Sequence, residues 1–184
     1  QNRAILLAGD VDASTLPLLE KEFSKFQRKA GDAPDPGELP PMKSRTETTV
    51  MVPSNEGVIL AWPIVKSTHP DRPALEAMDR LLYDGRAGIL KRELLLPQKV
   101  TNAGSSPTFL REAGYFQLTA DALDGQSPAD LEKLLMGLVD KLQAGDFTDK
   151  DLQTAILHEE INLAQQLESN DGRMDLLTDA FVNG

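Results

Sequence analysis

The chain has 184 residues, about the length of one domain, and its 40% hydrophobic and 26% charged residues are an ordinary globular composition. Its 29 Asp and Glu outnumber its 19 Lys and Arg, giving a net charge of -10 without any Lys/Arg-rich run, so nucleic acid and anionic membrane surfaces are excluded as partners. It has no cysteine and no apolar run near the roughly 20 residues of a membrane-spanning helix, which excludes thiolate chemistry and membrane insertion.

The first part of the chain predicts a buried strand followed by an amphipathic helix. Residues 3–9 are a short apolar run that ends in a glycine, which is typical of a buried strand. Apolar residues then recur at helical spacing at Leu16, Leu19, Phe23 and Phe26. Four prolines follow within residues 31–44, which we interpret as an internal loop of a single domain covering residues 1–184.

The middle of the chain predicts four strands and two short helices. Each strand candidate is either an apolar run of strand length or an apolar–polar alternation, and turn residues separate the candidates. They are residues 46–52, 57–64, 99–105 and 115–121. The helices are expected at residues 75–82 and 87–95.

The last third of the chain predicts helices with clear start and stop signals. Ser127, Pro128 and Asp130 resemble a capping box with proline at the first helical position. Gly145 ends this helix, and a second helix begins near Thr148.

The chain end predicts a turn at residues 170–172 and a final helix at residues 174–182. Taken together, paired strands and clustered helices predict an α+β fold rather than a doubly wound one. We expect a two-layer sandwich in which helices cover one face of a mixed or antiparallel sheet.

The two histidines do not form a recognisable metal site. His69 lies in a proline-flanked turn, and we interpret it as a loop residue. His158 begins the run His-Glu-Glu-Ile-Asn, which lacks the second histidine of either H-E-x-x-H or H-x-x-E-H. A zinc site needs about three protein ligands, so we assign no metal-binding residue in this chain.

The remaining candidates for catalysis or binding have simpler structural interpretations. Carboxylates near predicted helix starts or turns are interpreted as capping or turn residues: Asp10, Asp12, Asp121, Asp124, Asp146, Asp149 and Asp151. Residues 85–88 lack the lysine of a phosphate-binding loop, and neither Ser105 nor Ser106 has a histidine partner. Trp62 and Phe116 are expected in the core. We therefore assign no catalytic residue.

Several segments together resemble the C-terminal half-domain of the M16 metalloproteases, the family of pitrilysin, insulinase and mitochondrial processing peptidase. The segments that carry the resemblance are Ile5-Leu-Leu-Ala-Gly-Asp-Val-Asp12, Val58-Ile-Leu-Ala-Trp-Pro63, His69-Pro-Asp-Arg-Pro-Ala-Leu75, Leu81-Leu-Tyr-Asp-Gly-Arg-Ala-Gly-Ile-Leu90 and Ala113-Gly-Tyr-Phe-Gln-Leu-Thr-Ala120. Their order and spacing cover nearly the whole chain. The chain begins at Gln1 rather than at a methionine, and we expect it to be an excerpt of a longer polypeptide.

The resemblance implies a two-layer unit that pairs with a homologous unit carrying the zinc motif H-x-x-E-H. This chain lacks that motif, so no cofactor is expected in it, and zinc is expected in another domain or a partner subunit. In some members of the family an arginine after the glycine-rich segment contacts substrate. Here Leu95 stands at that position and Arg92 lies one turn earlier, so the substrate-binding residues stay unassigned.

The first function implied is a non-catalytic domain of a zinc-dependent endopeptidase, inactive alone, which helps to enclose and position a peptide or protein substrate. The alternative is a structural core-type subunit of a larger complex, without proteolysis. A third hypothesis is an unrelated α+β ligand-binding domain with a closed apolar pocket. Resemblance to exported zinc proteases favours a periplasmic or cell-envelope location.

Overall fold

The computed structural model describes residues 4–26, 42–84 and 87–183. The chain divides into two compact units, and each is described by itself. One unit is Leu39–Asn162, which contains the sheet, and the other combines Gln1–Glu38 with Leu163–Gly184. Within the described ranges, no helix has both the length and the apolar character needed to cross a membrane.

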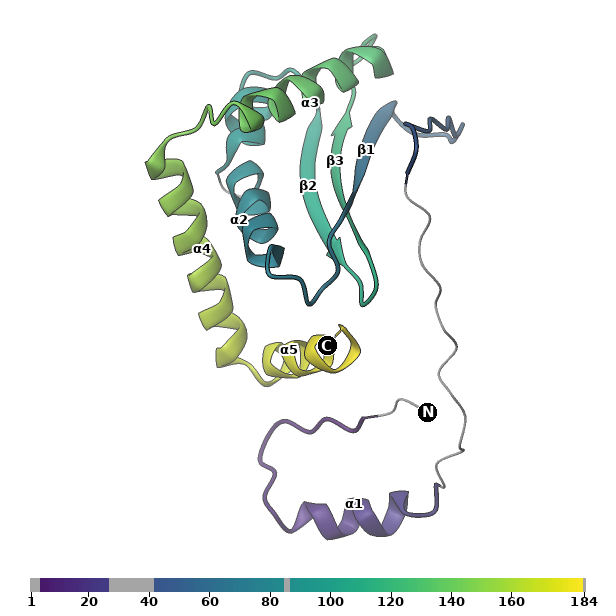
Figure 1. The fold of residues 1–184 in the computed structure, drawn as a ribbon, viewed down its shortest axis with the longest axis vertical. Coiled ribbons are helices and arrows are strands. Elements are labelled where there is room, and N and C mark those ends of the chain that lie inside the picture. Colours follow the sequence, from purple (N-terminus) through teal and green to yellow (C-terminus); the bar gives the residue numbers. More distant parts are fainter. Residues whose placement is uncertain (1–3, 27–41, 85–86, 184) are drawn as a thin grey trace. The chain divides into compact units, whose positions relative to one another are not determined.

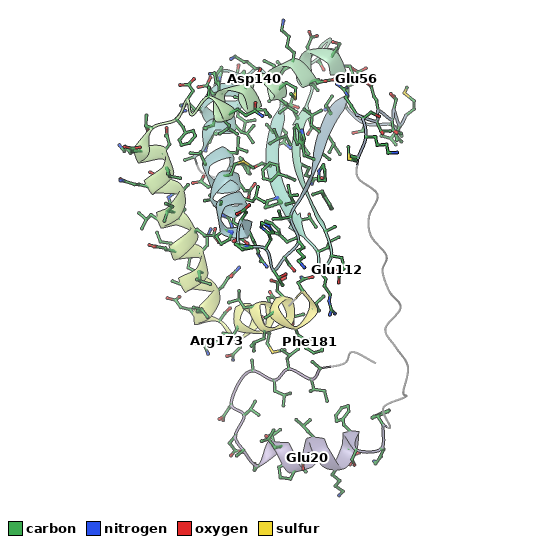
Figure 2. The ribbon with its side chains drawn as sticks, in the orientation of Figure 1. Glu20, Glu56, Glu112, Asp140, Arg173 and Phe181 are labelled. Atoms are coloured by element: carbon green, nitrogen blue, oxygen red, sulfur yellow. The ribbon has the colours of Figure 1, made fainter. Side chains whose placement is uncertain are left out.

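The larger unit is organised around an antiparallel sheet of three strands, β1 (Gly57–Ile64), β2 (Asn102–Phe109) and β3 (Gly114–Asp121), in the order β1-β3-β2 (Figure 1). Asp121 of β3 pairs with Gly57 on one side and with Asn102 on the other. Figure 2 labels Glu56 and Glu112 near opposite ends of this sheet. The central β3 therefore connects both outer strands over its full length.

Helices cover one face of the sheet. Helix α2 (Arg72–Leu82) and the π-helical turn η1 (Lys91–Leu95) contact β2, whereas α3 (Pro128–Gln143) contacts β1 and β3. The largest fully buried side chains are Leu82, Leu90, Leu94, Leu118, Leu131 and Leu135. The predicted α+β fold with helices on one face of an antiparallel sheet is confirmed.

Burial alternates along β3 as its sequence predicts. Phe116, Leu118 and Ala120 are buried against the helices, while the residues between them point to the opposite face. The predicted strand at 57–64 is confirmed at the same bounds, and its side chains alternate in the same way. One face of the sheet is thus apolar and covered, and the other is left to solvent.

The predicted capping box at the start of α3 is present. The backbone N–H of Asp130 donates to Ser127 Oγ at 3.2 Å, and the Ser127 N–H donates to Asp130 Oδ2 at 3.2 Å. Gly145 has a φ of +69° just after the helix, a left-handed conformation that favours glycine. These contacts set the register in which α3 turns its leucines toward the sheet.

The second long helix, α4 (Asp149–Glu168), begins as predicted. The Thr148 N–H donates to the Asp151 carboxylate, and the Asp151 N–H donates to the Thr148 hydroxyl.

The turn predicted at 170–172 is wrong, because α5 spans Asn170–Asn183 and includes those residues. The Gly172 N–H donates to Ser169 Oγ at 2.9 Å, so the serine hydroxyl pairs an N–H group of the first helical turn.

Helix α1 (Thr15–Phe23) is present but buries none of its residues, so its apolar stripe is not part of a core within the described residues. Asp12, predicted to cap this helix, accepts from the Ser14 N–H at 2.8 Å and holds the turn before it.

Two predicted strands do not form. Residues 4–9 and 46–52 have no ladder partner, and Ile5 is 47% and Met51 91% exposed. A strand needs a neighbour for its backbone groups, and an apolar run by itself does not supply one. Most of the predicted loop at 31–44, together with Arg3, lies outside the described residues.

The segment between α2 and β2 also differs from its prediction. The helix expected at 87–95 begins at Ile89 and widens into η1, where the Leu96 N–H bonds Lys91 O at 2.9 Å. The strand expected from residue 99 begins at Asn102, because the Lys99 N–H still bonds Leu94 O, at 2.9 Å. The wider turn keeps Leu94 buried.

We expect Leu135→Asp to abolish cooperative folding, because it places an unpaired carboxylate at a position that is 0% exposed. The neighbouring Met136 is 37% exposed, so Met136→Asp should change the free energy of unfolding by about 1 kcal/mol or less. Urea unfolding followed by circular dichroism compares the two variants. Equal stability of the two would contradict the packing described for α3.

Candidate functional site

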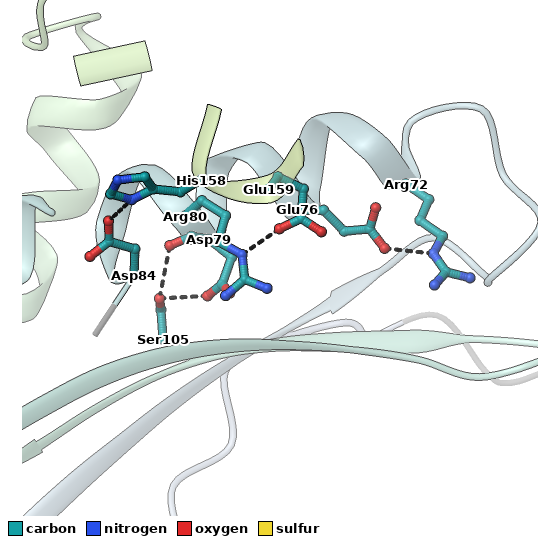
Figure 3. A network of polar contacts seen from close by, with 8 residues as sticks. All are labelled: Arg72, Glu76, Asp79, Arg80, Asp84, Ser105, His158 and Glu159. Carbon is teal, nitrogen blue, oxygen red and sulfur yellow. Dashed lines mark hydrogen bonds and ion pairs between the residues drawn. The ribbon is translucent and has the colours of Figure 1, made fainter. Parts of the chain in front are cut away.

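A network of polar side chains joins α2 to α4 and to the sheet (Figure 3). Arg72 Nε bonds Glu76 Oε1 at 2.8 Å within α2, where the two residues are one turn apart. Arg80 Nε, two turns along the same helix, bonds Glu159 Oε2 of α4 at 2.5 Å. The network therefore fixes α4 against α2 through charge.

His158 belongs to this network as the partner of Asp84. Its Nδ1 atom contacts Asp84 Oδ2, and the Asp84 side chain is only 4% exposed. The other oxygen of Asp84 accepts the backbone N–H of Ala87. Both oxygens of this buried carboxylate thus have hydrogen-bond partners, and one of the two partners is the His158 ring.

Ser105 and Asp79 form a second, half-buried pair in Figure 3. The Ser105 hydroxyl donates to Asp79 Oδ1 at 2.6 Å. Burial raises the pKa of Asp79, and this effect exceeds the lowering by the Ser105 hydrogen bond. Because Ser105 bonds Asp79 and His158 bonds Asp84, the four side chains do not form a Ser-His-Asp catalytic chain.

The described part of the chain does not fit the zinc that the family resemblance implies. None of its groups of three or more His, Cys, Asp or Glu side chains could hold a metal ion. His69 Nδ1 instead accepts the Asp71 N–H at 3.1 Å, in the turn that precedes α2. Both histidines therefore have local structural partners.

The other residues considered from the sequence also have structural partners. Arg92 NH1 bonds Asp151 Oδ1 at 3.2 Å, which ties η1 to the start of α4. Asp121 accepts from Asn102 Nδ2 at 3.2 Å across the sheet. Of the glycine segment 85–88, residues 85 and 86 lie outside the described residues.

The uncovered face of the sheet is the surface best suited to contact another molecule. It carries Ile59 and Tyr115, which are 68% and 41% exposed, on neighbouring strands. Between and around them are short or uncharged side chains: Ala61, Pro63, Ser106, Thr108, Gln117 and Thr119. The alternation in 115–121 predicted this face, although no motif marked it as functional.

Both outer strands also have an open edge within the described residues. β1 and β2 each pair with β3 alone, so one side of each strand has no backbone partner there. Each strand contains a proline, Pro63 in β1 and Pro107 in β2. Proline occurs in edge strands because it cannot donate to a ladder, and it limits uncontrolled pairing.

Comparison with known proteins identifies the family of this chain. A family profile described as the peptidase M16 inactive domain matches residues 1–157. The chain is 25% identical to the zinc protease PqqE of Helicobacter pylori over 190 aligned residues, which are 99% of this chain and 42% of that protein. The chain thus spans about two fifths of the length of this relative.

Two solved structures share the fold. A protease from Helicobacter pylori superposes with a TM-score of 0.82 at 22% identity, covering 96% of this chain and 44% of that one. The inactive peptidase domain of a proposed zinc protease from Bordetella parapertussis gives a TM-score of 0.61 at 16% identity, covering 71% of this chain and 73% of that one.

We expect Asp79→Asn to change how stability depends on pH. Burial raises the pKa of Asp79 in the folded chain above its value in the unfolded chain. The contribution of this side chain to the free energy of unfolding is therefore fully present below the unfolded pKa and is lost as the pH rises through the folded pKa. Asparagine does not titrate. Relative to wild type, the variant should therefore gain stability between about pH 4 and about pH 7, as measured by urea unfolding at both values.

Asp130→Asn is a control of opposite sign. The hydrogen bond with Ser127 lowers the pKa of Asp130 in the folded chain. The contribution of this carboxylate to the free energy of unfolding is therefore present above its unfolded pKa and is lost as the pH falls through the folded pKa. This variant should lose stability relative to wild type as the pH rises. If both variants shift in the same direction, the burial described for Asp79 is wrong.

His158→Ala should lower the free energy of unfolding by about 1–3 kcal/mol, because it removes a hydrogen-bonding partner from the buried Asp84 carboxylate. Adding Asp84→Asn should recover part of this loss. Zinc content, measured by atomic absorption, should not change in either variant. A stoichiometric zinc ion that disappears with His158 would contradict a structural role for this histidine.

Proposed function

This chain belongs to the M16 peptidase family as its inactive domain, and from that premise we propose that it helps to enclose and position a peptide substrate beside a zinc-carrying domain. The observation that carries the proposal is the family match over residues 1–157 in a chain whose described residues offer no three-ligand metal cluster. Zinc activates water at one centre, whereas exclusion of bulk water and orientation of the peptide require surrounding walls.

The uncovered sheet face supports this role as a wall. Ile59 and Tyr115 give it apolar contact area, and the short, uncharged side chains around them leave it smooth. A surface of this kind can contact peptides of varied sequence, because it presents few charges that would select for or against particular side chains.

The edge of β1 supports a second contribution, the alignment of an extended peptide. Backbone N–H and C=O groups on an open strand edge can pair with a peptide as an added strand. Such pairing orients a substrate through its backbone, with no requirement for a particular side chain. The strand with this open edge, β1, is also the strand that carries Ile59 on the uncovered face.

The partner that this function requires is a homologous zinc-carrying M16 domain, in the same polypeptide or in a second subunit. Relatives of about twice the length of this chain are consistent with such a domain in the same polypeptide. The chain alone is then inactive, and its contribution is to the shape and accessibility of the catalytic centre of its partner.

A side-by-side assay tests this division of roles. We expect zinc and endopeptidase activity in the full-length protein and neither in this chain alone. Metal analysis and cleavage of a fluorogenic peptide measure both. If the full-length protein holds no zinc and cleaves no peptide, the proposal fails and a structural subunit takes its place.

Ile59→Lys in the full-length protein tests the wall itself. A charge at this exposed position should leave the fold intact but lower kcat/KM about tenfold, equivalent to about 1.4 kcal/mol of transition-state binding. Met136→Lys, at a partly exposed position on α3, is the matched control and should leave kcat/KM unchanged. Equal kcat/KM in the two variants would show that the sheet face does not contact substrate.

A further inference from the structure

A groove runs along α3, on the helical layer of the larger unit. It has a volume of about 630 Å³ and is bounded by α3, by the segment from η1 to Lys99, and by Gln126. Its accessible apolar lining comes mainly from Leu134, because Leu94 and Leu138 are only 1% and 3% exposed. Its basic lining comes from Lys99, Lys133 and Lys141.

The charge of the groove is opposite to that of the chain. Three lysines line it beside two carboxylates, although the chain as a whole has a net charge of -10. Both carboxylates have partners, since Glu93 bonds Lys141 at 2.8 Å and Asp130 takes part in the capping box of α3. Within the described residues, the side-chain amino groups of Lys99 and Lys133 form no hydrogen bond or ion pair. The charge of Lys133 contributes to the lowered pKa of Asp130.

Gly137 lies in the middle of α3 and lines the same groove. Glycine in a helix interior is less favourable than alanine by about 1 kcal/mol, so helix stability does not account for Gly137. A Cβ atom built at Gly137 meets no atom within 4 Å, so nothing in the domain requires a glycine. The close approach of a second molecule to the backbone of α3 would require one.

We propose that this groove binds an acidic segment of a partner polypeptide, with carboxylates on Lys99 and Lys133 and an aliphatic side chain on the apolar lining. The lysine charges favour an acidic occupant, and the open space above Gly137 leaves room for it beside the backbone of α3. The groove belongs to the helical layer, whereas the proposed substrate surface is the uncovered sheet face. The inference is therefore independent of the proposed function.

The probe is an acetylated 12-residue peptide that alternates pairs of Glu and pairs of Leu, and its control has Gln in place of Glu. Isothermal titration of the whole chain should show binding of the Glu peptide that weakens as salt is added, because the contact is charged. The Gln peptide should bind at least about tenfold more weakly, a difference of about 1.4 kcal/mol.

Four variants locate the site. Lys99→Glu combined with Lys133→Glu should weaken Glu-peptide binding at least about tenfold. Gly137→Met should weaken it as well, by filling the groove, whereas Gly137→Ala should bind less tightly than wild type but more tightly than Gly137→Met. Lys150→Glu, on α4 and outside the groove lining, is the control for a single charge reversal and should bind like wild type. Circular dichroism confirms that each variant is folded.

Three outcomes would overturn the proposal. In the first, the Glu and Gln peptides bind equally. In the second, the double lysine variant binds like Lys150→Glu. In the third, the lysine variants change the sedimentation of the chain rather than its peptide affinity, which would make a second copy of the chain the occupant.

Discussion

The larger unit depends on the pairing of β3 with both of its neighbours. β1 and β2 do not pair with each other, so each is held in the sheet through β3. The same strand supplies Phe116, Leu118 and Ala120 to the buried face, against which the leucines of α3 pack. Within the described residues of the larger unit, the helices that contact this three-stranded sheet lie on one of its faces, so its second face has no helix over it there.

Helices α3 and α4 are held by different forces. α3 buries Leu131, Leu135 and Leu138, whereas the only buried residue of α4 is Ala155. The first half of α4 is fastened instead by ion pairs to α2, to Asp84 and to η1. Exposed ion pairs contribute about 0–1 kcal/mol each, so these contacts specify where α4 lies more than they stabilise the domain. Only the pair at Asp84 is buried enough to contribute more.

Local signals explain which parts of the fold could be predicted from sequence. Strand 57–64, the alternation in 115–121 and the capping box at Ser127 depend on residues close together in the chain, and all three are confirmed. Predicted strands at 3–9 and 46–52 depended on partners that no local pattern specifies, and their described residues form no ladder. The network around Asp79 and Asp84 joins residues more than twenty positions apart, so it was not predictable either. The sequence around His158 lacks a zinc motif, and the partner of this histidine could be identified only from the fold.

The absence of a catalytic motif is what the proposed function requires. A surface that orients a peptide through a strand edge uses backbone groups that every residue possesses, and a wall that excludes water needs shape rather than particular side chains. Such a surface requires the pairing of β3, a smooth uncovered face and prolines such as Pro63 that limit other pairing. These features are spread over three strands and leave no compact signature. The family is therefore recognised from the order of its elements, while the surface proposed to contact substrate becomes visible only when the strands are placed side by side.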